Sequence, residues 1–218
     1  MIKISTAVLM SLAFFVFGIY AGHLISSSFT LGIEQNPMVP ATSLKEQAEA
    51  DERAERQTRS QMQQASKPAD IDAVAAPNAQ DNMELSILKK ELRGNPEKAE
   101  AWTRLGNWYF DHSQPAEAVT AYAFSLKLRP DDPNVITDQG IMYRSLGQYE
   151  KALATFRLAS KIAPWHNPAL FNTGVALLDL KRRQEALETW KTLQARDPKF
   201  ITPRGVSITE TIKSMEQE

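Results

Sequence analysis

The chain has 218 residues, and its 25 basic side chains nearly balance its 26 acidic ones. Nucleic-acid binding favours a strong excess of positive charge, so we expect no nucleic-acid partner. Because the sequence contains no Cys, it cannot form a disulfide, a thiolate metal site, a Cys nucleophile or the Cys-x-x-Cys-His attachment of haem. Its three histidines, His23, His112 and His166, have no metal-ligand spacing, and we expect neither a metal nor a cofactor.

The first segment is a candidate membrane anchor. Residues 4–33 contain no Asp, Glu, Lys or Arg, and residues 7–25 are almost wholly apolar, about the length of a transmembrane helix. Positive charge precedes this stretch at Lys3 and returns only at Lys45, which favours a cytoplasmic N-terminus. In a bacterium, residues 1–25 would then form a single span of the inner membrane, with the rest of the chain in the periplasm. A cleaved signal peptide is the alternative.

The next segment, residues 26–80, is predicted to be a polar linker. Residues 42–66 are rich in good helix formers, but their apolar positions form no continuous stripe, so we expect a solvated helix there. Residues 67–80 contain two prolines and few bulky side chains, and they cannot bury enough apolar surface to offset the entropy of ordering. This part is interpreted as a tether.

The second half of the chain repeats with a period of 34 residues. This period divides the sequence into units 99–132, 133–166 and 167–200. Four types of residue recur at it: Pro96, Pro130, Pro164 and Pro198; Gly106, Gly140 and Gly174; Ala118, Ala152 and Ala186; and the aromatics Tyr122, Phe156 and Trp190.

This pattern resembles the tetratricopeptide repeat, in which W-x2-L-G-x2-Y is followed by Ala, an aromatic residue and Pro. The first unit matches it best, with Trp102, Leu105, Gly106, Tyr109, Ala118, Tyr122 and Pro130. The resemblance implies an all-α fold, a solenoid of three helical hairpins, besides the predicted transmembrane helix. Capping helices are expected at residues 81–98 and 201–218, and Gly94 stands where a glycine ends a helix.

In this family, the first helix of each unit lines a concave face that binds peptides. Carried over residue by residue, this predicts a peptide-binding groove made of Asn107, Phe110, Ile141, Arg144, Phe171, Asn172, Val175 and Leu178. A clamp for a peptide's terminal carboxylate needs Lys and Arg at specific positions of the groove. Here Thr103 occupies one such position, and Asn107 is the one residue that matches the clamp. We therefore expect an apolar peptide as ligand. Packing inside the solenoid is the alternative role of Phe110 and Phe171.

Two charged clusters lie in predicted turns. Residues 181–183 form a basic run in the third unit, which we expect to be solvated, with contact to an anion or a lipid headgroup as the alternative. Asp131 and Asp132 precede Pro133 at a predicted helix start. They are interpreted as a turn and a helix cap, not as an acid-base pair.

The segment ELSILKKELRGNPEKAEAWTRLGNWYF, with the predicted anchor and linker before it, resembles the single-span tetratricopeptide proteins of bacterial cytochrome c biogenesis. The resemblance covers roughly residues 84–200. It implies an adaptor or chaperone whose client is the C-terminal segment of an apocytochrome, held for a haem lyase. A scaffold or assembly factor of an envelope complex, such as a translocon, an outer-membrane assembly machine or a pilus, is the alternative. The sequence has no nucleophile, metal or phosphate-binding motif, so we expect no enzyme.

Overall fold

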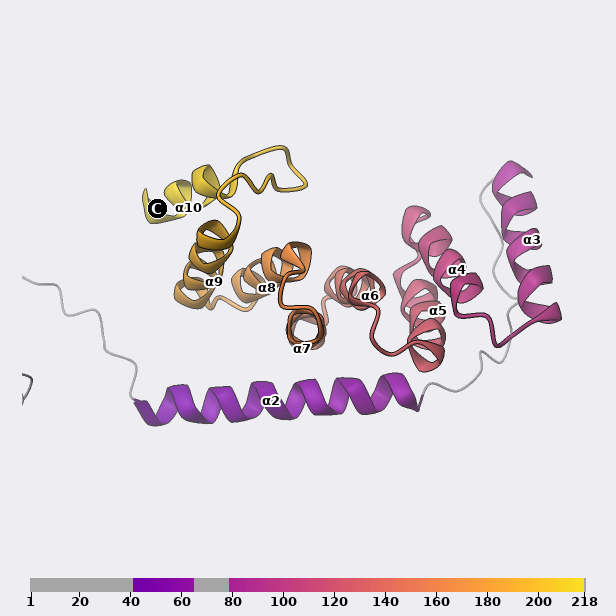
Figure 1. Cartoon of the computed structure of the whole chain (residues 1–218), viewed down its shortest axis with the longest axis horizontal. Helices are drawn as coiled ribbons and strands as arrows, with labels where there is room; N and C mark the ends of the chain where they lie inside the picture. Colours follow the sequence, from indigo (N-terminus) through magenta and orange to yellow (C-terminus); the bar gives the residue numbers. More distant parts are fainter. Residues whose placement is uncertain (1–40, 65–78, 218) are drawn as a thin grey trace, which may run out of the picture. The chain divides into compact units, whose positions relative to one another are not determined.

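The structure, a computed structural model, describes residues 41–64 and 79–217 (Figure 1). The predicted membrane anchor lies outside these residues, and among the helices within them none is long and apolar enough to cross a membrane. The described part of the chain forms nine α-helices: α2 (Ala41–Gln63), α3 (Ala79–Gly94), α4 (Ala99–Asp111), α5 (Pro115–Leu128), α6 (Pro133–Ser145), α7 (Tyr149–Ile162), α8 (Asn167–Asp179), α9 (Arg183–Arg196) and α10 (Ile208–Gln217).

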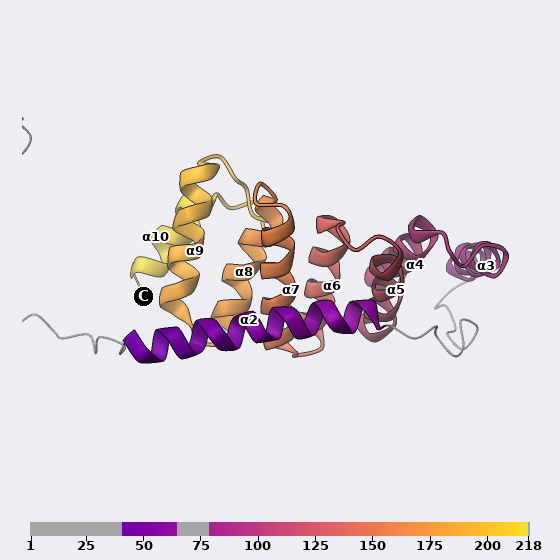
Figure 2. The same cartoon turned by 60° about the horizontal axis from the view of Figure 1, so that its bottom comes forward.

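Three helical hairpins, α4 with α5, α6 with α7 and α8 with α9, make up the repeated part of the chain. Each helix from α4 to α9 packs against the next one in sequence, so the hairpins stack in chain order (Figures 1 and 2). The all-α solenoid predicted from the 34-residue period is thereby confirmed. Its three hairpins fall within residues 99–132, 133–166 and 167–200.

The core of the solenoid consists of the large side chains of the repeat motif. Trp102, Tyr122 and Phe156 are buried almost completely. The indole Nε1 of Trp102 donates a hydrogen bond to the carbonyl oxygen of Pro96, over 2.8 Å, so the first repeat also fixes the turn that precedes it. One hydrophobic cluster contains Trp102 and Tyr122 of the first hairpin and Ile136 and Leu158 of the second, so these hairpins share a core.

Local signals set where the helices begin and end. Pro133 opens α6, a position where its missing N–H costs nothing. The Asp132 carboxylate accepts hydrogen bonds from the backbone N–H groups of Asn134 (3.1 Å) and Val135 (3.3 Å), which confirms its predicted role as a helix cap. Gly94 is the last residue of α3, but its φ angle lies outside the left-handed region, so it does not form a left-handed cap.

The helix α2, which the sequence predicted to be solvated, instead packs along α5 and α7 (Figure 2). It buries Thr58 and Met62, whose side chains are 5% and 6% exposed. The sequence showed no apolar stripe because this packing face is largely polar and charged.

The C-terminal segment packs against the last hairpin, α8 with α9. An isolated antiparallel bridge joins Ile201 to Ser207, and α10 follows it. Ile208 and Ile212 of α10 are buried against Trp190 and Leu193 of α9. The last hairpin therefore completes its core with residues outside the repeat.

Candidate functional site

The predicted peptide-binding groove begins at a cleft of about 520 Å³ between α3 and α4. Two apolar side chains of α3 remain open to solvent at this cleft, Met83 at 67% exposure and Ile87 at 54%. Such exposed apolar side chains beside polar groups are typical of a peptide-binding surface. The cleft is lined by Met83, Glu84, Ile87, Leu88, Arg104, Asn107, Trp108, Asp111 and His112.

The polar side chains of this cleft are partly engaged within the protein. Asn107, predicted as a groove residue, lies here and is exposed, and its Oδ1 accepts a hydrogen bond from the Tyr122 hydroxyl over 2.9 Å. Arg104 forms an ion pair with Glu91 of α3. The position of Asn107 is thus fixed by the core, and the charge of Arg104 is already balanced.

An aromatic pair forms one wall of the cleft. The ring of His112 stacks on Trp108 with centroids 3.8 Å apart and planes at 15°. The His112 Nδ1 also lies 2.6 Å from the Trp108 carbonyl oxygen. The Trp108 side chain is only 3% exposed, and its indole Nε1 has no hydrogen-bond partner among the described residues. Neither residue was predicted in the groove, because Trp108 does not stand at a repeat position that the family uses for binding, and His112 lies in the turn after α4.

Of two further carboxylates, Asp111, at the end of α4, lines the cleft itself, and Asp138 lies on α6. Burial, together with the smaller effect of the negative charges of Asp132 and Asp111, raises the pKa of Asp138 to about 6. Asp138 forms no ion pair within residues 41–64 and 79–217. A carboxylate in this environment favours a nearby cation.

Besides Asn107, three of the predicted groove residues belong to the first two hairpins. Phe110 and Ile141 are half-buried and pack against the first hydrophobic cluster of the core. Arg144 is exposed, and it forms an ion pair with Asp179 of α8 that links the first helices of consecutive hairpins. The guanidinium of Arg144 is therefore already paired with a carboxylate of this chain.

The third hairpin places its predicted groove residues against the C-terminal segment. The Phe171 ring lies 5.6 Å from that of Trp190, nearly parallel to it at 11°, and 5.6 Å from that of Phe200. Val175 and Leu178 are half-buried against the cluster of α9 and α10. The Nδ2 of Asn172 donates to the Pro168 carbonyl oxygen over 2.9 Å. Part of this apolar surface is thus covered by the chain itself.

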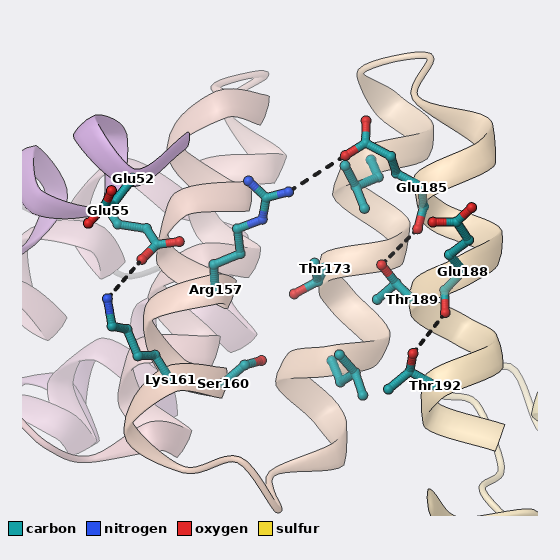
Figure 3. Close-up of a pocket in the computed structure, with 12 residues that line it drawn as sticks. Glu52, Glu55, Arg157, Ser160, Lys161, Thr173, Glu185, Glu188, Thr189 and Thr192 are labelled. Carbon is teal, nitrogen blue, oxygen red and sulfur yellow. Dashed lines mark hydrogen bonds and ion pairs between the residues drawn. The ribbon is translucent and has the colours of Figure 1, made fainter. Parts of the chain in front are cut away.

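A second cleft, of about 590 Å³, lies between α2 and helices α7 to α9 (Figure 3). Carboxylates and hydroxyl groups dominate its walls, including Glu185, Glu188, Thr189 and Thr192 of α9. At this cleft, the Nζ atom of Lys161 on α7 lies 3.8 Å from the Oε2 atom of Glu55 on α2. Burial raises the pKa of Glu55, although the positive charges of Lys161 and Arg157 oppose this shift. The sequence does not predict this cleft, because the cleft depends on the position of α2.

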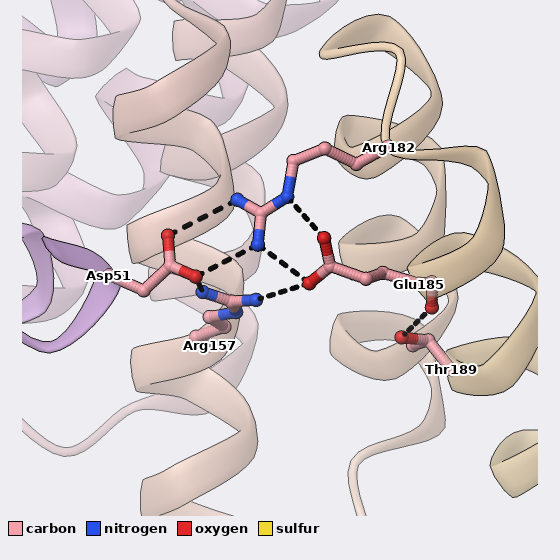
Figure 4. A network of polar contacts seen from close by, with 5 residues as sticks. All are labelled: Asp51, Arg157, Arg182, Glu185 and Thr189. Carbon is pink, nitrogen blue, oxygen red and sulfur yellow. Dashed lines mark hydrogen bonds and ion pairs between the residues drawn. The ribbon is translucent and has the colours of Figure 1, made fainter. Parts of the chain in front are cut away.

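The basic run at residues 181–183 was expected to be solvated, and this is wrong for Arg182, which is half-buried among carboxylates, whereas Lys181 and Arg183 are exposed. The Arg182 guanidinium donates to both oxygens of Asp51, at 3.2 and 2.9 Å, and to both oxygens of Glu185, at 2.7 and 2.6 Å (Figure 4). Arg157 also pairs with Asp51. Burial alone would raise the pKa of Asp51, but the hydrogen bonds from Arg182 and Arg157 outweigh it and lower that pKa. This network joins α2 to the last two hairpins.

Comparison with known families agrees with the fold. The family model of the tetratricopeptide repeat matches residues 103–168 and 137–199. The small glutamine-rich tetratricopeptide repeat-containing protein 2 of Mycosarcoma maydis is 30% identical over 101 residues, 46% of this chain and 29% of that protein. The tetratricopeptide repeat protein 4 of Homo sapiens is 27% identical over 139 residues, 61% of this chain and 35% of that protein. The chain thus spans about a third of the length of these relatives.

Solved structures share the same arrangement of helices. A crystal structure of MamA covers 63% of this chain and 79% of its own, with 18% identity and a TM-score of 0.56. The first tetratricopeptide domain of Spaghetti (RPAP3), bound to the Hsp90 peptide SRMEEVD, covers 55% of this chain and 91% of its own, with 22% identity and a TM-score of 0.50. At these identities the likeness shows the fold alone.

Proposed function

We propose that this chain, whose residues 103–199 consist of tetratricopeptide repeats, binds a segment of a client protein along α4, α6 and α8. It acts as a protein-protein interaction module. The eight predicted groove residues are part of the proposal: the exposed Asn107 and Arg144, and the half-buried Phe110, Ile141, Phe171, Asn172, Val175 and Leu178.

The cleft between α3 and α4 carries this proposal. Its volume of about 520 Å³ takes one or a few side chains of a peptide, and the exposed Met83 and Ile87 supply apolar contact area at its mouth. Asn107 offers its amide to a peptide backbone from a fixed position, because its Oδ1 is held by Tyr122. A preorganised groove of this kind loses less entropy on binding than a mobile one.

The proposal also includes a membrane tether. Residues 1–25 anchor the chain in the inner membrane by a single span, and the repeats lie in the periplasm. The support is the apolar sequence of residues 7–25, with Lys3 before it. A C-terminal alkaline phosphatase fusion, which is active only after export, tests the orientation. An inactive fusion in an intact, expressed protein would contradict it.

The proposed client is the C-terminal segment of an apocytochrome c, held in an extended or helical form for haem attachment. The support is the similarity of residues 84–110 to the corresponding passage of cytochrome c biogenesis proteins. Such a role requires no catalytic group on this chain, because the lyase performs the covalent step. A non-covalent adaptor needs only a groove and release of the product.

Site-specific photo-cross-linking in cells of the source organism tests the proposal. A photoreactive amino acid replaces Ile87 in the cleft or, as the control, Thr120, which is exposed on α5. We expect a haem-free cytochrome polypeptide to be cross-linked from position 87 and not from 120. A folded multi-subunit complex cross-linked from both positions would instead support a scaffold or assembly factor. No cross-linked protein from position 87 would contradict client binding in this groove.

A further inference from the structure

The side of α2 that packs on the repeats is largely polar and charged. Within residues 45–64, the buried and half-buried side chains fall on one stripe of the helix: Gln47, Asp51, Ala54, Glu55, Thr58 and Met62. Of this stripe only Ala54 and Met62 are apolar, so hydrophobic burial contributes little to the attachment of α2. The charged side chains therefore supply most of the attachment.

Two acidic side chains of this stripe face two basic side chains of α7 in matching order. Asp51 pairs with Arg157. One turn farther along both helices, Glu55 pairs with Lys161, with the two charged atoms 3.8 Å apart. The spacing of four residues is the same on both helices, so these pairs select the bound face of α2 and its register on α7.

The positive charges beneath α2 exceed the carboxylates with which the repeats pair them. Arg157 and Arg182 both pair with Asp51 of α2 and with Glu185 of α9 (Figure 4). Among the described residues outside α2, Glu185 is the one carboxylate that forms ion pairs with these two arginines. Lys161 pairs with α2 as well. Without α2, the basic surface formed by Arg157, Lys161 and Arg182 would keep a single paired carboxylate.

The attachment of α2 is sensitive to salt. Side chains at its edges remain open to solvent: Lys161 is 67% exposed, and Arg59, which pairs with Asp131 over 3.6 Å, is 50% exposed. Exposed ion pairs of this kind are weak and are screened by salt. Elements with few buried apolar contacts also open at a lower free energy than the core. We therefore expect α2 to leave the repeats while the repeats stay folded.

We propose that the basic surface is a docking site for an acidic helix of a partner protein, and that α2 occupies this site until the partner displaces it. The partner helix carries carboxylates at the spacing of Asp51 and Glu55, because α2 shows what the surface accepts. The adjoining cleft of about 590 Å³ has room for a further polar side chain of the partner (Figure 3). The basic surface lies on α7 and at the start of α9, so it is separate from the proposed peptide-binding groove along α4, α6 and α8.

Alkylation of a single cysteine in the purified full chain tests this inference. The chain contains no Cys, so Thr58→Cys places one thiol on the buried side of α2, where Thr58 is 5% exposed. Iodoacetamide, which is uncharged, reacts with this thiol when α2 opens. Gln57→Cys, exposed on the same helix, and Ser125→Cys, buried inside the first hairpin, are the controls. Circular dichroism verifies that all three variants are folded.

Salt provides the first measurement. Raising the salt concentration from about 0.05 M to about 1 M shortens the Debye length to about 3 Å. This change should accelerate alkylation of Thr58→Cys about tenfold and leave both controls unchanged.

A peptide added in trans then probes the docking site. The probe has the sequence of residues 41–64, and its control carries Asp51→Asn and Glu55→Gln. At about 1 mM, the range of intramolecular effective concentrations, the probe should accelerate alkylation of Thr58→Cys at low salt at least about twofold, because it occupies the site while α2 is displaced. The control peptide should have no effect.

Four results would overturn the inference. Alkylation of Thr58→Cys as fast as that of Gln57→Cys at low salt would mean that α2 does not cover the basic surface. Slow alkylation at every salt concentration would make α2 a permanent part of the fold, and equal acceleration of Ser125→Cys would mean that the repeats open with it. Acceleration by salt but not by the probe peptide would show that the surface accepts no helix in trans. None of these results bears on client binding along α4, α6 and α8.

Discussion

Gly140 lies directly against the ring of Phe156. A Cβ atom at Gly140 would lie 2.5 Å from Cε1 and 2.8 Å from Cδ1 of this ring. Phe156 is fully buried, so its ring cannot move aside without displacing its own neighbours. The same relationship joins Gly106 to Tyr122. The glycine of each repeat is therefore required by the close approach of two helices, not by an unusual backbone conformation.

Substitution of Gly140 by Ala should lower the free energy of unfolding by about 2–3 kcal/mol, because the added methyl group overpacks the helix crossing. Gly94→Ala is the matched control. A Cβ there meets no atom within 4 Å, and Gly94 is helical, so this change should be neutral or slightly stabilising. Urea unfolding of both variants measures the difference. Equal stabilities would show that the crossing tolerates a methyl group.

Substitution of Asp138 by Asn should stabilise the protein at pH 8 by about 1 kcal/mol, a value reduced for the partial exposure of the side chain. The folded-state pKa of Asp138, about 6, lies above the usual aspartate pKa of 3.8. The penalty is therefore absent below pH 4, grows between pH 4 and 6, and is complete above pH 6. Urea unfolding at pH 4 and pH 8 tests this dependence. A destabilising effect of Asn at pH 8 would mean that the carboxylate already has a partner.

The repeated part of the fold could be predicted because its determinants are local and periodic. Gly140 and Phe156 stand at the same distance in sequence as Gly106 and Tyr122, so the period reveals the helix crossings without any knowledge of the structure. The start of α6 is likewise set by two neighbouring residues, Asp132 and Pro133. Because such signals are local, the fold of a helical repeat can be predicted from a single sequence.

The position of α2 could not be predicted, because its contacts join residues far apart in sequence. Asp51 and Arg182 are separated by 131 residues, and their interaction is ionic, so no hydrophobic pattern marks it. The contact of Phe171 with Phe200 was missed for a related reason. Phe200 lies in an irregular segment outside the helical hairpins, where the period gives no information about packing.

Substitution of Asp51 by Asn should loosen α2 while leaving the repeats folded. Arg157 and Arg182 would lose their shared partner. We expect a local free-energy cost of about 1 kcal/mol, and this cost corresponds to roughly fivefold faster hydrogen exchange of α2. The lowered pKa of Asp51 gives a second signature: its contribution is present above pH 4 and disappears as the pH falls through the folded-state pKa. Exchange in residues 45–63, followed by mass spectrometry, measures both effects. Glu49→Gln, on an exposed position of the same helix, is the control.

Substitution of Phe171 by Ala separates a packing role from a binding role. The Phe171 ring stacks on Trp190 and contacts Phe200, so its loss should lower the free energy of unfolding by about 2 kcal/mol. Ile87→Ala, at a position 54% exposed in the cleft, should change stability by less than about 0.5 kcal/mol and act on client binding alone. Thermal unfolding and client cross-linking of the two variants provide the comparison. Unchanged stability of Phe171→Ala with weaker client binding would show that Phe171 is a groove anchor and not a core residue.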